Sequence, residues 1–430
     1  MNTINIINLG CSKNVVDSEH LARQLKANGY NVLYDQTDLF DITLINTCGF
    51  IHDAQQESIE TILEIADQNK DNPNSFLGVF GCLTQLFAKE LKKEIPEVNA
   101  WFGKYDANDI VEALNGKFKH DLSHERILST PKHYAYLKIS EGCHRKCAFC
   151  SIPIITGDYK SFSPEELIKE ANFLAQNGVK ELILIAQDLT WYGQDLKHKP
   201  TLTELVREIS KIDGIKWIRL HYAYPVGIPE DLFEEMNHNP KICKYIDIPI
   251  QHISSDVLKA MRRGHNGPST KKILNDIRSK VEGVEIRTTL IVGFPGESEE
   301  HFQELSSFIQ EFKFEKMGAF PYSHEAYTFA FEKLKDNVDE ETKQRRLDEI
   351  MEIQHDVAFQ HNQNKIGKSF IVIIDRQEDN VYYGRTEYDS PDVDGEVIIT
   401  SEKLLTIGNF YKVKITDAEA FDLYGEVIYA

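Results

Sequence analysis

Between residues 131 and 325, short apolar stretches alternate six times with helical patterns, and this alternation restricts the fold more than any other feature. The apolar stretches have the length and composition of buried strands, over residues 134–139, 181–186, 217–221, 245–250, 285–292 and 317–321. Helical periodicity separates them, for example over residues 164–176, 202–212, 270–281 and 299–312. Right-handed strand–helix units in series curl into a full or partial barrel, with functional groups at the carboxyl ends of the strands.

The first 120 residues have a related pattern. Three apolar stretches, residues 4–9, 42–47 and 76–80, are each followed by a helical stretch. This order predicts an open parallel α/β sheet.

From residue 369 onwards the pattern changes to five short apolar stretches punctuated by Gly, Asp and Pro. They cover residues 370–375, 381–386, 395–400, 410–416 and 421–428, and they predict a small antiparallel barrel of the OB type. This segment contains five Lys and Arg but thirteen Asp and Glu, a net charge of −8.

We therefore expect a multidomain α/β protein with three domains. Residues 1–125 would form the open parallel α/β sheet. Residues 126–366 would form a partial (β/α)₆ barrel, which ends in a polar helix predicted over residues 340–363. Residues 367–430 would form the five-stranded antiparallel OB-like barrel.

The chain is acidic, with 48 Lys and Arg against 68 Asp and Glu and a formal net charge of −20. This balance disfavours direct binding of nucleic acid and suits a basic protein partner. The first residues lack the basic and apolar regions of a signal peptide, and no apolar run approaches the roughly 20 residues of a membrane helix. We therefore expect a cytoplasmic protein without a membrane partner. In such a protein we expect the seven cysteines to serve as metal ligands or catalytic groups rather than as a disulfide framework.

Cys143, Cys147 and Cys150 follow the first strand of the predicted barrel with the spacing C-x₃-C-x₂-C. One short loop at the barrel mouth therefore supplies three thiolates. A structural zinc site needs four protein ligands, whereas a [4Fe–4S] cluster held by three thiolates leaves one iron open for chemistry. The alternatives are a turn that merely contains three cysteines and a zinc knuckle completed by His144.

Cys11, Cys48 and Cys82 each end a predicted strand of the N-terminal sheet. Because the carboxyl ends of parallel strands share one edge, where ligands bind, we expect these three thiols to converge and to face the Cys143 loop across one cavity. Taken singly, each would more simply be a small buried apolar residue. Cys243, at the amino end of the fourth barrel strand, fits that simpler description.

With these residues in view, the chain resembles the radical SAM superfamily and, with Cys11, Cys48 and Cys82 added, its methylthiotransferases, which end in a TRAM barrel. The resemblance covers nearly the whole chain and implies two [4Fe–4S] clusters, one on each cysteine trio. The Cys143 cluster would cleave S-adenosylmethionine (SAM) reductively to a 5′-deoxyadenosyl radical. The N-terminal cluster would hold the sulfur that becomes the methylthio group. SAM would be used twice, as methyl donor and as radical source, with electrons from a reductant such as flavodoxin or ferredoxin.

Four segments, residues 184–196, 221–225, 245–252 and 383–395, resemble the RimO branch of this family. That branch methylthiolates the β-carbon of one aspartate of ribosomal protein S12, so S12, free or in the small subunit, is the implied partner. The MiaB branch, which modifies an adenosine of tRNA, is the nearest alternative, but a terminal barrel of net charge −8 should repel a phosphate backbone. A non-enzymatic, zinc-bound RNA-binding module is an alternative of a different class.

The resemblance implies further site residues. Gln187 and Asp188, at the end of the second barrel strand, would bind the methionine part of SAM, or simply form a polar barrel rim. The loop after the fifth strand would line the adenosine pocket, or be a turn that needs glycine, and its residues are Gly293, Gly296 and Glu297. We interpret the basic segment 261–265 as a solvated loop rather than a ligand contact. The predicted substrate-binding residues of the last domain are Arg385, Tyr388, Asp389, Asp392 and Asp394.

Four positions depart from the family pattern. After Cys150 the family commonly has an Arg before a Gly and a Ser-Arg pair, where this chain has Thr156 and Phe162 as the differing residues. After Cys82 a frequent Arg-Tyr pair is replaced by Leu86 and Phe87. Fewer cations near the clusters would alter their potential, but no predicted cluster ligand is lost.

Overall fold

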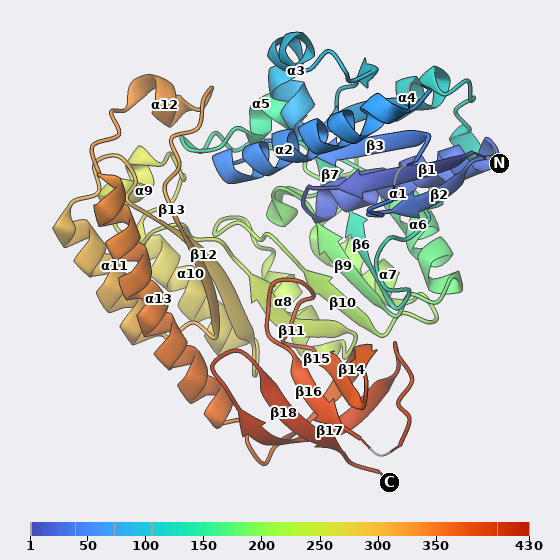
Figure 1. The fold of residues 1–430 in the computed structure, drawn as a ribbon. Coiled ribbons are helices and arrows are strands. Elements are labelled where there is room, and N and C mark those ends of the chain that lie inside the picture. Colours follow the sequence, from blue (N-terminus) through green and yellow to red (C-terminus); the bar gives the residue numbers. More distant parts are fainter. Residues whose placement is uncertain (1, 39, 73, 105, 402, 430) are drawn as a thin grey trace.

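The computed structural model of this chain describes residues 2–38, 40–72, 74–104, 106–401 and 403–429. It consists of two parallel sheets and a closed barrel (Figure 1). The N-terminal sheet, drawn in blue, lies across one end of the larger central sheet, and the C-terminal barrel, drawn in red, lies at the other end.

The N-terminal sheet is parallel throughout, with strand order β2-β1-β3-β4-β5. Its strands are β1 (Thr3–Asn8), β2 (Asn31–Tyr34), β3 (Ile42–Thr47), β4 (Phe76–Gly81) and β5 (Ala100–Trp101). All of β3 is buried, as is typical of a parallel strand covered on both faces. The sequence did not predict the edge strands β2 and β5, because strands of four and two residues are too short to give a clear pattern.

Helices follow β1, β3, β4 and β5, and two of them begin at a predicted ligand cysteine. They are α1 (Ser12–Ala27), α2 (His52–Gln68), α3 (Cys82–Glu94) and α4 (Ala107–Ala113), with short 3₁₀ turns η1 (Asn69–Asp71) and η2 (His120–Leu122). Cys11 is the N-cap of α1 and Cys82 is the first residue of α3. The carboxyl edge of the sheet therefore carries thiols at two helix starts.

The central sheet is parallel and open, with strand order β13-β12-β11-β10-β9-β6, so the predicted partial (β/α)₆ barrel is confirmed. Its strands are β6 (Tyr134–Lys138), β9 (Glu181–Ile185), β10 (Trp217–Leu220), β11 (Ile242–Asp247), β12 (Glu285–Val292) and β13 (Lys316–Pro321). The fourth strand was predicted three residues too late, because the apolar run continues past the strand end into the buried Ile248 and Ile250. Cys243 is buried within β11, beside Trp217 and Tyr245.

Helices lie between and after these strands, together with a small pair of strands near the cysteine loop. The helices are α5 (Ile152–Thr156), α6 (Pro164–Gln176), η3 (Leu189–Trp191), α7 (Leu202–Ser210), α8 (Glu230–His238), α9 (Ser255–Ala260), α10 (Gly267–Lys280), α11 (Glu299–Phe312) and α12 (Phe329–Lys333). The small pair consists of β7 (Ser140–Glu141) and β8 (Lys160–Ser161). Helix α13 (Glu340–Gln363) then runs along the outside of the sheet to the barrel (Figure 1).

The C-terminal barrel closes in the order β14-β15-β16-β18-β17, so the predicted five-stranded barrel is confirmed. Its strands are β14 (Ser369–Glu378), β15 (Val381–Thr386), β16 (Val397–Thr400), β17 (Phe410–Ala418) and β18 (Leu423–Val427). One pair departs from the predicted antiparallel arrangement, since β16 lies parallel to β18. The chain runs from β16 through β17 to β18 and reverses its direction at each step, so β18 has the direction of β16. In the barrel β18 lies beside β16, and the two are therefore parallel.

Buried ion pairs join the barrel to the central sheet. Arg385 contacts Glu181 at 2.8 Å and Asp375 at 2.7 Å, and Arg219 contacts the same Glu181 at 2.8 Å. Of these pairs, the one between Arg385 and Glu181 crosses from the barrel to the central sheet, and the other two give each of its charges a second partner.

No helix among the residues that the structure describes is both long enough and apolar enough to cross a membrane. The domain boundaries at residues 125/126 and 366/367 stay predictions.

Candidate active site

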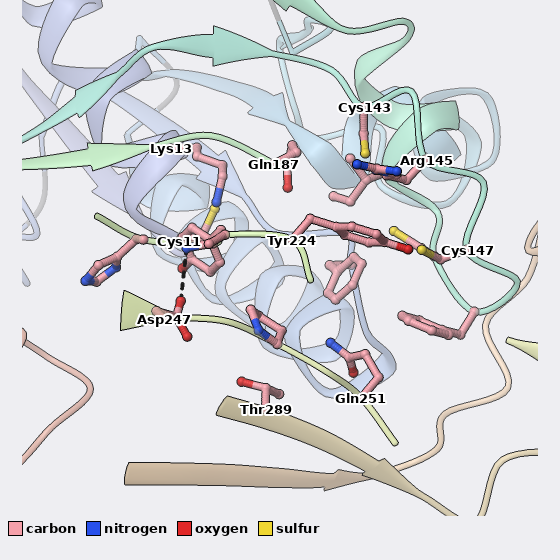
Figure 2. A pocket seen from close by; sticks show the side chains of 18 of the residues that line it. Cys11, Lys13, Cys143, Arg145, Cys147, Gln187, Tyr224, Asp247, Gln251 and Thr289 are labelled. Atoms are coloured by element: carbon pink, nitrogen blue, oxygen red, sulfur yellow. Dashed lines mark hydrogen bonds between the residues drawn. The ribbon is translucent and has the colours of Figure 1, made fainter. Parts of the chain in front are cut away.

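All six predicted ligand cysteines line one cavity of about 420 Å³ between the N-terminal and central sheets. Cys11, Cys48 and Cys82 come from the carboxyl edge of the N-terminal sheet, and the other three come from the loop after β7. In the view of Figure 2, Cys11 and Lys13 lie on one side of the cavity and Cys143 and Cys147 on the other. The strand ends of the central sheet contribute further lining residues, among them Gln187, Tyr222, Tyr224, Asp247, Gln251, Arg287 and Thr289.

Asn14 draws the N-terminal cysteines together. The thiols of Cys11 and Cys82 each donate to Oδ1 of Asn14 at 3.8 Å, so both sulfurs lie close to one oxygen atom. The amide nitrogen of Asn14 donates in turn to Oδ1 of Asn46 at 3.0 Å and to the carbonyl of Thr47 at 3.1 Å. One buried side chain therefore connects α1, the end of β3 and the start of α3.

Two glycines allow the segments after β3 and β4 to approach each other. Gly81 has φ +109°, and a Cβ there would lie 2.6 Å from the carbonyl oxygen of Thr47. A Cβ on Gly49 would lie 2.7 Å from the backbone nitrogen of Leu83. A larger residue at either position would push the cysteine-bearing segments apart.

The second trio lies on a single loop with its own hydrogen bonds. The N–H of Cys143 donates to the carbonyl of Gly157 at 3.2 Å, and the N–H of Cys150 donates to the carbonyl of Cys147 at 3.2 Å. Because the three cysteines lie on one short loop, their relative positions depend mainly on the local backbone of that loop.

Arg263 supports this loop from the central domain. Its Nη1 donates to Sγ of Cys147 at 3.3 Å, its Nη2 donates to the carbonyl of Pro249 at 2.7 Å, and its guanidinium lies 4.3 Å from the ring centre of Tyr224. Arg263 is buried, so the interpretation of segment 261–265 as a solvated loop is wrong at this position. The cause is that the turn after α9 folds back under the cysteine loop.

Burial raises the pKa of four of the cavity thiols. It raises the pKa of Cys82 to about 12 and that of Cys143 to about 11, and it also raises the pKa values of Cys48 and Cys150. Neighbouring cysteines of the same trio add to the rise for Cys82 and Cys150. Such thiols keep their protons until a metal displaces them.

The donor chemistry fits iron–sulfur clusters. Each trio supplies three thiols, and no group of three or more His, Cys, Asp or Glu within the described ranges is arranged around a single metal ion. A cubane cluster distributes its ligands over separate iron atoms and needs a wider arrangement. His144 stacks on Trp191 with ring centres 3.9 Å apart. The geometry therefore gives the zinc alternative no support.

The cavity lining is cationic although the chain is acidic overall. Its described residues include one carboxylate, Asp247, and five cations. The cations are Lys13, Lys104, Arg145, Arg263 and Arg287. Burial and the surrounding cations hold the pKa of the lining residue His221 well below its usual value, so its ring is neutral. Such a lining suits anionic contents, such as thiolate-bound clusters and carboxylates.

Two lining residues have a left-handed backbone that side chains rarely adopt. Tyr222 has φ +66° and Gln251 has φ +71°. Oε1 of Gln251 is also buried without a hydrogen-bond partner. Strained residues and unsatisfied polar atoms of this kind are concentrated at ligand sites.

Of the two residues predicted at the end of the second strand, Gln187 lines the cavity and Asp188 does not. The buried carboxylate of Asp188 accepts from Nε of Arg145 at 2.9 Å and from the hydroxyl of Thr190 at 2.6 Å. Asp188 thus orients Arg145, which does line the cavity. A SAM contact by Gln187 and Asp188 stays a prediction.

The loop from Gly293 to Glu297 forms a closed turn outside the cavity lining. Oε2 of Glu297 accepts from the N–H groups of Gly293 at 2.9 Å and Phe294 at 3.3 Å, and Oε1 accepts from Arg346 at 2.9 Å. Burial raises the pKa of Glu297 to about 7. Gly293 and Gly296 both have positive φ, as the turn interpretation requires. The predicted adenosine contact stays a prediction.

The five predicted substrate residues of the last domain lie where the barrel meets the central domain. Asp389 contacts Lys316 at 2.6 Å, and Tyr388 packs its ring against Phe370. Asp392 accepts from the hydroxyl of Tyr136 at 3.0 Å. Asp394 lies 3.5 Å from Arg287, a cavity residue, and Arg385 forms the buried pairs described above. These contacts within the protein explain the positions of the five side chains. Binding of a substrate at this place stays a prediction.

Sequence reasoning did not single out most of the polar lining. Lys13 stands two residues after Cys11, Arg145 lies inside the cysteine loop, and Tyr222 follows a strand end. Their positions next to a predicted ligand or at a carboxyl strand end were the available signal. Of the departures from the family pattern, Thr156, Phe162, Leu86 and Phe87, none lines the cavity.

Three family descriptions match successive parts of the chain. Residues 3–103 match an uncharacterized protein family designated UPF0004, residues 137–309 match the radical SAM superfamily, and residues 366–428 match the TRAM domain. Among solved structures, the radical SAM methyltransferase TsrM from Kitasatospora setae covers 74% of this chain and 73% of its own, with a TM-score of 0.53 and 12% identity. At that identity the likeness concerns the fold alone.

Curated relatives are similar over nearly the full length. The ribosomal protein uS12 methylthiotransferase RimO of Christiangramia forsetii is 52% identical over 99% of this chain and 94% of its own. The RimO proteins of Flavobacterium psychrophilum and Parabacteroides distasonis are 53% and 48% identical, each over 99% of this chain and over 98% and 99% of their own. The chain therefore belongs to the RimO family of radical SAM methylthiotransferases.

Proposed function

We propose that this enzyme transfers a methylthio group to the β-carbon of an aspartate of ribosomal protein uS12, as the names of its relatives indicate for them. The observation that carries the proposal is that six cysteines, in two trios, line one cavity. A single cluster would suffice for SAM cleavage, so a second trio at the same cavity supports insertion of sulfur.

In this proposal Cys143, Cys147 and Cys150 hold one [4Fe–4S] cluster and SAM, and the other trio holds the second cluster. When bound, the first supplies a hydrogen-abstracting radical and the second supplies the sulfur. SAM would lie among the lining residues near Gln187, with Asp188 holding Arg145 in place. The protein also needs electrons from a reductant, for which flavodoxin or ferredoxin is the predicted donor.

Side chains of the cavity would exclude water from the reaction and stabilise negative charge. Phe50, Phe149, Ile152 and Tyr224 make part of the lining apolar, which keeps water from a reactive intermediate. Arg263 donates to the sulfur of Cys147 and would so stabilise added negative charge on a cluster held there.

The acidic C-terminal barrel, with a net charge of −8, would attract a basic ribosomal protein and repel tRNA. The domain division at residues 1–125, 126–366 and 367–430 is part of this proposal, as is a cytoplasmic location. The barrel would orient uS12 so that its target loop enters the cavity.

The test is anaerobic reconstitution with iron and sulfide, followed by incubation with SAM, a reductant and uS12. We expect the intact mass of uS12 to rise by one methylthio group in place of one hydrogen, with fragmentation placing it on an aspartate. An unmodified uS12, together with methylthio-adenosine formed in a parallel reaction on tRNA, would replace this proposal by the tRNA activity.

A further inference from the structure

Lys13 differs from the other cations of the cavity in its partners. Lys104 contacts Glu141 at 2.9 Å, Arg145 contacts Asp188 at 2.9 Å, Arg287 contacts Asp247 at 3.2 Å, and Arg263 donates to a thiol and a carbonyl. Within the described residues, the ammonium of Lys13 has neither a carboxylate nor a carbonyl partner and lies 3.7 Å from the ring centre of Tyr222.

This ammonium is also in an unfavourable place. Lys13 is 5% exposed, so its side chain is largely shielded from bulk solvent and its ammonium meets only the interior of the cavity. It lies in the first turn of α1, where the helix dipole is positive and no acidic residue offsets it. A buried cation in such surroundings needs an anion, and the π-face of one tyrosine replaces only a part of that interaction.

The position of Lys13 determines which anion it can serve. It follows Cys11 by two residues, and its side chain extends from the Cys11 side of the cavity (Figure 2). The loop with Cys147 lies on the opposite side and already has Arg263 and Arg145 beside it. An anion bound by Lys13 therefore sits near the predicted sulfur source, away from the predicted SAM cluster.

We propose that Lys13 binds the γ-carboxylate of the target aspartate and so makes the site specific for an acidic side chain. The inference rests on the proposed function. The γ-carboxylate is bonded directly to the β-carbon, so an ammonium that holds it fixes the carbon to be modified next to the N-terminal trio. The strained backbone of Tyr222 would hold its ring as the floor under the Lys13 side chain until substrate arrives.

The experiment compares wild type with Lys13→Met, which keeps the length and apolar stem of the side chain. Exposed Lys89, on α3 of the same domain, provides the matched control Lys89→Met. Each reconstituted enzyme is tested for affinity to wild-type uS12 and to uS12 whose target aspartate is replaced by asparagine. Iron and sulfide content, visible spectrum and SAM affinity are measured on the same samples.

We expect wild type and Lys89→Met to bind the aspartate form roughly 10- to 100-fold more tightly than the asparagine form, as a charge-assisted hydrogen bond predicts. Lys13→Met should bind both forms equally and keep its iron, its spectrum and its SAM affinity. Three results would each overturn the inference: a preference for aspartate that survives in Lys13→Met, a loss of iron in that variant, or a matching loss of SAM affinity. The last two would assign Lys13 to a cluster or to SAM.

The experiment distinguishes failure of the proposed function from failure of the inference about Lys13. If wild type leaves uS12 unmodified, both ideas fall. If wild type modifies uS12 while Lys13→Met still discriminates the two forms, only the inference about Lys13 falls.

Discussion

The two cysteine trios meet at one cavity but are assembled in different ways. Cys143, Cys147 and Cys150 lie within eight residues on one loop, whereas Cys11, Cys48 and Cys82 come from three separate strand ends. The first arrangement depends on local spacing, and the second depends on the sheet that brings distant segments together. Two sites of the same ligand chemistry should therefore respond differently to changes in the fold.

The largest expected effect comes from removing one ligand of each trio. Cys147→Ala and Cys48→Ala should each abolish methylthiolation and lose about half of the iron, because the trios would serve two independent clusters. Cys147→Ala should also abolish SAM cleavage, while Cys48→Ala should retain it. Iron and sulfide analysis with an assay of 5′-deoxyadenosine checks this. An unchanged iron content in Cys48→Ala would remove the N-terminal trio from consideration as a cluster site.

A smaller effect should separate the two modes of assembly. Gly81→Ala introduces a Cβ that collides with the end of β3, so it should destabilise the N-terminal sheet by ~1–3 kcal/mol and lower the iron held there. Iron at the Cys143 loop should stay. Gly29→Ala is the matched control, since Gly29 also has positive φ but has nothing within 4 Å of its Cβ position. Equal iron loss from both trios would mean that they do not assemble independently.

Arg263→Met should alter the loop site alone. Loss of the hydrogen bond to Cys147 removes stabilisation of the reduced cluster, so the reduction potential of that cluster should fall and SAM cleavage should slow. The potential of the N-terminal cluster should be unchanged. Redox titration followed by electron paramagnetic resonance checks both, with exposed Arg262→Met as control. A potential that shifts at both clusters would contradict the separation of the two sites.

The smallest effect concerns a buried carboxyl outside both trios. The pKa of Glu297 is about 7 in the folded protein, against an ordinary 4.5, so the folded state holds this proton where the unfolded chain has lost it. Its contribution to stability is therefore complete below about pH 4.5 and declines as the pH rises to about 7. Glu297→Gln should flatten this decline by an amount on the order of 1 kcal/mol, whereas exposed Glu304→Gln should not. Thermal unfolding of the metal-free protein between these pH values checks it. A decline that stays as steep in Glu297→Gln would assign it to other groups.

Patterning along the chain predicted the two parallel sheets and the barrel because most of their strands are buried and apolar. It missed β2 and β5, which are only four and two residues long, and it displaced β11, whose apolar run continues into Ile248. It also missed the parallel pairing of β16 with β18, since pairing between strands that are not consecutive leaves no local signal.

At the site, spacing and strand ends identified the cysteines but not their surroundings. Arg263 was assigned to solvent, and Lys13 was not considered, because neither burial nor a missing partner can be read from neighbouring residues. The acidic and basic residues of the last domain suggested a substrate surface, whereas Arg385 and Asp389 form pairs with residues of the central domain.

The sequence by itself determined the element types, the loop trio and the acidic balance, since periodicity, short spacing and composition are local properties. Only the tertiary structure decided that Asn14 links Cys11 to Cys82, that Arg263 donates to the sulfur of Cys147, and that the buried ammonium of Lys13 has no carboxylate partner among the described residues. Each of these depends on which distant segments pack together, and that is set by the burial of whole sheets and helices rather than by any one segment.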